Sequence, residues 1–91
     1  QMEKSIYSQG YSHFLEKLRQ ARESKGLTQS EIAERLGQTQ SFISKVERGE
    51  RRVDIVELWA FCNAIGEKFS VFVKELDENF RANRSSDDFN S

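Results

Sequence analysis

The chain has 91 residues, of which 36% are hydrophobic and 32% are charged, a composition typical of one small globular domain. Its single cysteine and single histidine exclude an internal disulfide and a metal site built on paired thiols or two histidines of one chain. No apolar run approaches the roughly 20 residues that a membrane-spanning helix requires, and no catalytic or phosphate-binding motif is present. We therefore expect a cytoplasmic protein that is not an enzyme and needs no cofactor or metal. Cys62 is expected to be a buried thiol rather than a redox switch, and His13 a surface residue rather than a pH sensor.

The net charge is −1, but the charges are unevenly distributed. Residues 35–52 carry five basic side chains against two acidic ones, which makes this segment +3. Residues 53–91 carry four basic side chains against eight acidic ones, which makes that segment −4. A chain of this kind can present a positive face to a polyanion although its overall charge is slightly negative.

Apolar residues recur at spacings of three and four along most of the chain, which predicts an all-α fold of five helices. The first is expected over residues 12–25, after a flexible arm formed by residues 1–10. Thr28 with Glu31, and Asp54 with Glu57, have the capping-box spacing, so a second helix over 28–36 and a fourth after Asp54 are expected. The third is expected over residues 40–48 and the fifth over 68–80, before a disordered tail over 82–91. The glycines lie near the ends of these stretches, where they are expected to end helices or form turns: Gly10, Gly26, Gly37, Gly49 and Gly66.

Two short helices joined at Gly37 form a helix-turn-helix, in which the second helix lies in the major groove of DNA. That second helix lies in the stretch LGQTQSFISKVERG, residues 36–49, which has glutamines, hydroxyls and a lysine on the face that it does not bury. Glutamine can pair with adenine and lysine with guanine, while small hydroxyls adapt to bases or phosphates. The alternative, a merely solvated polar face, is common on helices. The clustering inside this motif favours base reading.

The segment GLTQSEIAERLGQTQSFISKVERGERR resembles the helix-turn-helix core of the lambda-repressor-like, or Xre, family of bacterial and phage transcriptional regulators. The resemblance covers about residues 14–66 and includes the LTQ opening, the alanine and glycine between the two helices, and the ERG ending. It implies a five-helix lambda-repressor-like fold, with residues 11–66 as the domain that binds double-stranded DNA. The chain departs from the family in having ERRVD where a proline or small polar residue often follows the ERG turn.

The same resemblance implies roles for individual residues. Those expected to face base edges are Gln40, Ser41, Ser44 and Lys45. Those expected to contact phosphate are Gln29, Thr39, Arg48, Arg51, Arg52 and Arg22. Gln29 is also expected to brace the recognition helix near Gln40, and Arg19 and Arg22 match positions that either steady the fold or touch phosphate. Phe42 could pack against the next helix or contact a thymine methyl group.

Residues 67–81 lie outside the resemblance and are expected to form a helix that holds two copies together. Its apolar stripe would form the dimer interface: Phe69, Phe72, Val73, Leu76 and Phe80. The alternative is that this helix folds back onto the first and fourth helices and buries the stripe within one chain. Trp59, one position away from the main apolar stripe of the fourth helix, is either a second interface residue or an isolated exposed aromatic.

These observations predict a homodimeric transcriptional repressor that reads an inverted-repeat operator through the major groove. An antitoxin and a restriction-modification controller of the same fold are alternatives, and so is an adaptor that binds protein rather than DNA. An unidentified protein partner stays open in each case. An enzyme is the least favoured alternative, because the sequence has no catalytic constellation.

Overall fold

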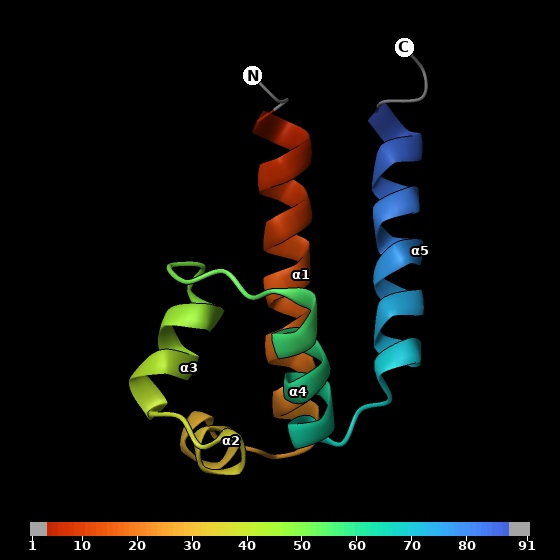
Figure 1. The fold of residues 1–91 in the computed structure, drawn as a ribbon. Coiled ribbons are helices and arrows are strands. Elements are labelled where there is room, and N and C mark those ends of the chain that lie inside the picture. The colour runs from red at the N-terminus through yellow and green to blue at the C-terminus, as the bar shows by residue number, and fades with distance from the viewer. Residues whose placement is uncertain (1–3, 88–91) are drawn as a thin grey trace.

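A computed structural model describes the backbone of residues 4–87 and the side chains of residues 9–82. Over this range the chain forms five helices and no strand, so the predicted all-α fold is confirmed (Figure 1). The helices are α1 (Lys4–Ser24), α2 (Gln29–Leu36), α3 (Gln40–Glu47), α4 (Ile55–Ile65) and α5 (Phe69–Asp87). None of them is both long enough and apolar enough to cross a membrane.

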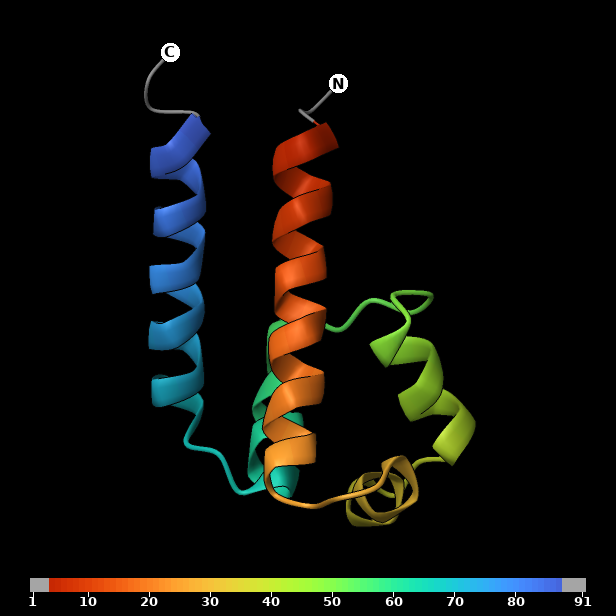
Figure 2. The same cartoon turned by 180° about the vertical axis from the view of Figure 1, so that it is seen from behind.

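The two long helices, α1 and α5, run antiparallel and side by side, so both described ends of the chain lie at the same end of the molecule (Figures 1 and 2). Helix α4 lies across one side of α1 and also packs against α2 and α5. Helices α2 and α3 pack mainly against each other at the opposite end from the termini, where α3 also contacts α1. The helix-turn-helix therefore projects from a support made of α1 and α4.

Both predicted capping boxes are present and explain where α2 and α4 begin. The Thr28 hydroxyl accepts from the Glu31 amide at 3.1 Å, while the Glu31 carboxylate accepts from the Thr28 amide at 2.8 Å. Asp54 and Glu57 make the corresponding bonds at 2.7 and 2.9 Å. These bonds satisfy amide groups that the first turn of a helix leaves without a partner. At the other end of α2, Gly37 adopts a φ of 67°, which turns the chain directly into α3 and is rarely accessible to other residues.

The end of α4 is held by two cations from the neighbouring segments. The Lys25 amine donates to the Gly66 carbonyl at 3.0 Å, and the Arg35 guanidinium donates to the Ala64 carbonyl at 2.7 Å. Positive charge is favourable here because the last carbonyls of a helix carry partial negative charge. These two bonds connect the end of α4 to α2 and to the turn after α1.

The core gathers apolar side chains from all five helices. Buried members are Phe14, Leu18, Ile32, Ala33, Ile43, Val46, Leu58, Phe61, Cys62, Ile65, Phe72 and Leu76. Burial raises the pKa of the Cys62 thiol to about 11, so it is protonated at neutral pH and the expected buried thiol is confirmed. His13 is exposed, as expected. Phe42 packs against the core beside Phe61, with ring centroids 6.5 Å apart, which supports the packing role for this residue.

The two long helices extend further than the sequence predicted. Helix α1 begins at Lys4 rather than residue 12, so the segment expected to be a flexible arm is helical from residue 4 onward. Gly10 lies inside this helix rather than at its end, and a Cβ atom added at this position would lie 3.7 Å from the Phe80 ring of α5. Helix α5 continues to Asp87, seven residues beyond the predicted end, so residues 82–87 are helical. Residues 1–3 and 88–91 lie outside the described range.

The apolar stripe of α5 packs within the single chain. Phe72 is 0% exposed and meets the Phe14 ring of α1 edge to face, with centroids 6.3 Å apart. Leu76 is 9% exposed. The interface role predicted for these two residues is therefore wrong, because side chains buried inside one chain cannot contact a second copy. Phe69, Val73 and Phe80 are partly buried, and their interface role stays a prediction.

Neighbouring residues of α5 allow a direct test of this packing. Phe72→Ala should lower the free energy of unfolding by about 3–5 kcal/mol, because it removes a fully buried ring and leaves a cavity. Val71→Ala is the matched control on the same helix; its side chain is 41% exposed and its loss should change stability by less than about 0.5 kcal/mol. Urea denaturation followed by circular dichroism measures both. Equal effects of the two substitutions would contradict the burial of Phe72.

Candidate nucleic-acid interface

Helix α3 buries one side and exposes the other. Ile43 and Val46 are fully buried, and the Thr39 hydroxyl begins the helix by accepting from the Phe42 amide at 3.1 Å. The four predicted base-reading residues lie on the remaining surface. Gln40, Ser41 and Lys45 are exposed, and Ser44 is half-buried. The structure therefore brings these four side chains together on one short helix whose apolar face is held from behind. Their contacts with bases stay a prediction.

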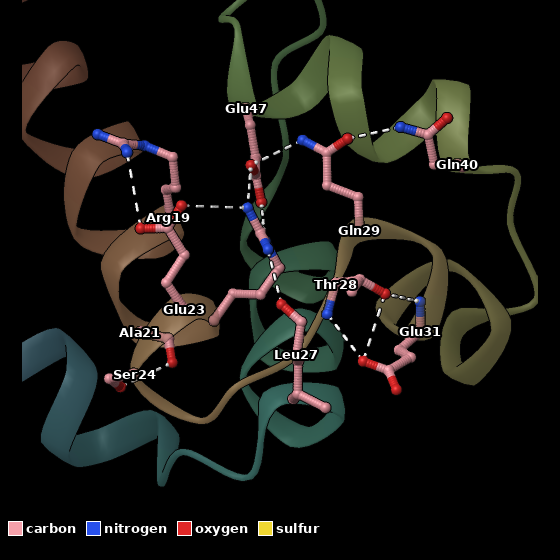
Figure 3. Close-up of polar contacts among 11 residues, drawn as sticks. Arg19, Ala21, Glu23, Ser24, Leu27, Thr28, Gln29, Glu31, Gln40 and Glu47 are labelled. Atoms are coloured by element: carbon pink, nitrogen blue, oxygen red, sulfur yellow. Dashed lines mark hydrogen bonds and ion pairs between the residues drawn. The ribbon is translucent and has the colours of Figure 1, made fainter.

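A chain of hydrogen bonds leads from the first residue of α3 back into the fold (Figure 3). The side-chain amide of Gln40 donates to the side-chain oxygen Oε1 of Gln29 at 2.6 Å, and the side-chain amide of Gln29 donates to the Glu47 carboxylate at 3.0 Å. The predicted bracing of Gln40 by Gln29 is thus present. The bond uses one N–H of the Gln40 amide and leaves its oxygen and second N–H free. Those two groups are the acceptor and donor that pair with adenine.

The chain ends at a buried ion pair between α1 and α3. The Nε and Nη2 atoms of Arg22 donate to the two carboxylate oxygens of Glu47, at 2.7 and 3.0 Å. Its Nη1 atom donates to the backbone carbonyl of Leu27 at 2.7 Å. The two side chains are 10% and 6% exposed. The hydrogen bond to Glu47 raises the pKa of the Arg22 guanidinium further above its already high value, although desolvation opposes this shift. Glu47 therefore has a fixed positive partner and can serve as a fixed acceptor for Gln29.

This geometry corrects the phosphate role predicted for Arg22. Its guanidinium is directed into the fold and its three nitrogens donate to Glu47 and Leu27, so it cannot reach a DNA backbone. Arg22 instead steadies the fold, which is the other role that the resemblance allowed. Arg19 is exposed on the same helix, and its guanidinium nitrogens lie 3.9 Å from a carboxylate oxygen of Glu16 and 3.7 Å from one of Glu23.

Arg51, a second predicted phosphate contact, is held by α4. Its guanidinium makes two hydrogen bonds to Glu57, at 3.1 and 2.9 Å, and lies 4.9 Å from the centre of the Phe42 ring. These bonds raise the pKa of Arg51 and lower the pKa of Glu57. Arg51 therefore fastens the loop after α3 to the start of α4. A phosphate could reach it only in competition with Glu57, and its phosphate role stays a prediction.

The other cations beside α3 differ in how they are engaged. Arg52 has no carboxylate partner among the described residues and lies 4.3 Å from the centre of the Tyr11 ring. Arg48 is exposed and donates to Glu50, at 3.0 and 3.1 Å, and to the Ser44 hydroxyl. The Lys45 side chain makes no hydrogen bond or salt bridge with any described residue, although its backbone carbonyl accepts from the Glu50 and Arg51 amides. Lys45 and Arg52 therefore supply positive charge beside α3 without first leaving a carboxylate. Arg48 can do so by giving up its exposed ion pair with Glu50.

Sequence reasoning assigned no role to Glu47, and it assigned Glu57 only a capping role at the start of α4. Both are acidic residues in or beside the basic segment, where an unpaired carboxylate would repel a polyanion. An acidic residue at such a position therefore indicates a basic partner within the fold. The structure supplies one for each, since Arg22 pairs with Glu47 and Arg51 pairs with Glu57. The partner of Glu47 is 25 residues away in the sequence, so its identity could not be read from spacing.

Known proteins are similar to this chain in sequence or in fold. The helix-turn-helix family matches residues 18–72. An uncharacterized HTH-type transcriptional regulator, y4dJ, of Sinorhizobium fredii is 37% identical over 57 residues, which cover 63% of this chain and 74% of that protein. An XRE-family like protein from Pseudomonas syringae pv. tomato superposes with a TM-score of 0.79 at 41% identity, over 82% of this chain and 92% of that one. The clp gene regulator ClgR from Corynebacterium glutamicum superposes with a TM-score of 0.70 at 25% identity, over 88% of this chain and 85% of that one.

The ion pair can be separated from the rest of the fold by mutation. Glu47→Ala should lower the free energy of unfolding by about 3 kcal/mol, because it leaves the Arg22 charge buried without a partner. The double variant Arg22→Met with Glu47→Leu should recover most of this loss, since both charges are replaced by apolar side chains of similar volume. Thermal and urea denaturation measure both, with the exposed Glu50→Ala as the control. If Glu47→Ala were as mild as that control, the pair would not be buried in solution.

Proposed function

The chain belongs to the helix-turn-helix family of XRE-type transcriptional regulators, and from this membership we propose that it acts as a homodimeric repressor. Each copy would read one half of an inverted-repeat operator with α3 in the major groove. The observation that carries the proposal is the outer face of α3, on which Gln40 is held by Gln29 with its pairing groups free. A side chain fixed in this way loses little rotamer freedom when it meets a base, which favours sequence-specific binding.

Base reading is assigned to four residues of α3, and backbone contacts to the groups around it. Lys45 would donate to guanine, while Ser41 and Ser44 would adapt to neighbouring base edges or phosphates. Thr39 and the amide groups at the starts of α2 and α3 would donate to phosphates, as helix N-termini do. Arg48 and Arg52 supply the positive charge on the flanks. Gln29 could add its second N–H to a phosphate without releasing Glu47.

Repression is the simplest outcome of such binding. A protein that occupies a promoter blocks transcription without any contact to the transcription machinery, so the binding surface alone is enough. Two copies are proposed because α3 has only eight residues and can reach a few base pairs. An operator with half-site centres about 10 to 10.5 base pairs apart, or a multiple of this turn, would present two such sites on one face of the duplex. A protein that regulates transcription in this way would act in the cytoplasm.

The first test is whether the protein binds duplex DNA and how salt changes its affinity. The purified protein should select a preferred inverted repeat from a pool of random duplexes. A plot of log affinity against log salt concentration should have a slope of about −5, because roughly six cations of a dimer, Lys45, Arg48 and Arg52 from each copy, replace counterions. Fluorescence anisotropy measures this slope. A flat response would favour the protein-binding adaptor instead.

The second test separates base reading from charge. Gln40→Ala should weaken binding to the selected sequence by about 1–3 kcal/mol and leave binding to random DNA nearly unchanged, because only the specific site loses a base contact. Arg52→Ala should weaken both kinds of binding alike, since every duplex has phosphates. Lys74→Ala is the control, an exposed lysine on α5 away from α3. An unchanged sequence preference in Gln40→Ala would contradict the proposed placement of α3.

A further inference from the structure

Helix α4 has an exposed apolar face that no described part of the chain covers. Ile55 is 64% exposed, Val56 69% and Trp59 53%. Positions 55 and 56 lie four and three residues before position 59, and position 63 lies four residues after it, so all four fall on the side of the helix that is centred on Trp59. Asn63 is exposed and completes this side. We call these four residues the α4 face; α4 lies at the front of the molecule in Figure 1.

The α4 face has no charged side chain. The only charged residue within α4 is Glu57, and its carboxylate is paired with Arg51. A surface that contacts its own copy across a two-fold axis places each residue near the same set of residues on the partner. Any net charge would then meet like charge, which is destabilising. An uncharged apolar face avoids this repulsion, so it is complementary to itself.

The outer sides of α5 and α3 do not have this property. The outer side of α5 is rich in charged residues and has more acidic than basic ones: Lys74, Glu75, Asp77, Glu78 and Arg81. The outer side of α3 carries the polar residues assigned to DNA. A second copy packed on either surface would bury charges or block the recognition helix. The α4 face remains as an apolar surface that leaves α3 free.

We propose that the α4 face binds the α4 face of a second copy, with the two helices antiparallel across a two-fold axis that passes near Trp59. Trp59 stands near the middle of the 11-residue helix, so an antiparallel pair brings it against its own copy and brings Val56 near Asn63 of the partner. Central tryptophans surrounded by apolar side chains dominate the binding energy of many interfaces. The antiparallel arrangement also places opposite ends of the helix dipoles together. The inference deepens the proposed function, because it states where the two copies meet.

The experiment uses the DNA-free protein and the fact that Trp59 is its only tryptophan. Sedimentation velocity over a concentration series should show a dimer that dissociates on dilution. The Trp59 emission should shift to longer wavelength over the same concentrations, because dissociation exposes the ring to water. A monomer at all concentrations, or a dimer whose emission does not change on dissociation, would overturn the proposal.

Substitutions locate the contact. Trp59→Glu should raise the dimer dissociation constant about 30-fold or more, because it removes a central aromatic and places two carboxylates at the axis. Val56→Glu should do the same while keeping Trp59 as the fluorescent probe. Asn79→Glu on α5 is the control, with the same change of charge at an exposed site. Circular dichroism should show that all three variants remain folded, since none of these side chains is buried. A Trp59→Glu protein that stays dimeric would place the interface elsewhere.

The outcome is independent of DNA binding. A dimer through the α4 face that fails to bind any duplex would support this inference and contradict the proposed function. A protein that binds its operator while Trp59→Glu leaves its dimerisation unchanged would support the proposed function and overturn this inference. If both hold, the monomeric Trp59→Glu protein should still bind a single half-site.

Discussion

The arrangement of the helix-turn-helix depends on the buried ion pair between Arg22 and Glu47. Arg22 joins the end of α1 to the last residue of α3 and to the Leu27 carbonyl in the turn before α2. Such a pair adds little net stability compared with apolar packing of the same volume, because both charges must leave water. It does restrict geometry: a rotation or shift of α3 would separate the charges and leave one of them buried alone. The pair therefore fixes where α3 sits, and through Gln29 it fixes the side chain of Gln40.

Contacts on the inner side of α3 hold the helix in place, and its outer side can therefore be polar. A helix of eight residues does not form by itself in water, and α3 is anchored by the buried Ile43 and Val46 and by the partly buried Phe42. The remaining stability comes from the Thr39 cap, the Arg22–Glu47 pair and the loop that Arg51 fastens to Glu57. Because all of these contacts lie at the ends or on the inner side of α3, no residue on its outer side is needed for folding. The side chains there are available for DNA.

Local patterns predicted much of this molecule. Both capping boxes and the turn at Gly37 match the structure, and α3 begins at the predicted residue and ends one residue earlier than predicted. Contacts between distant segments could not be read in this way. Arg22 was predicted to touch phosphate or to steady the fold, and its spacing of four and eight residues from Leu18 and Phe14 places it on the buried side of α1, which favours the second role. The burial of Phe72 depends on how α5 packs on α1, which no local pattern specifies. The early start of α1 and the late end of α5 were not predicted, because these polar stretches have no regular spacing of apolar residues. Both stretches are helical where α1 and α5 run side by side.

The central claim is that Gln29 transmits the position set by the ion pair to Gln40, so the two glutamines act as one unit on DNA. A double-mutant cycle on operator affinity tests it most directly, with Gln29→Ala, Gln40→Ala and the combined variant. If the account is correct, the losses are not additive and the coupling energy is about 1 kcal/mol or more, as for side chains in one hydrogen-bond network. Additive losses within about 0.3 kcal/mol would show that Gln40 reads DNA without help from Gln29, and would contradict the account.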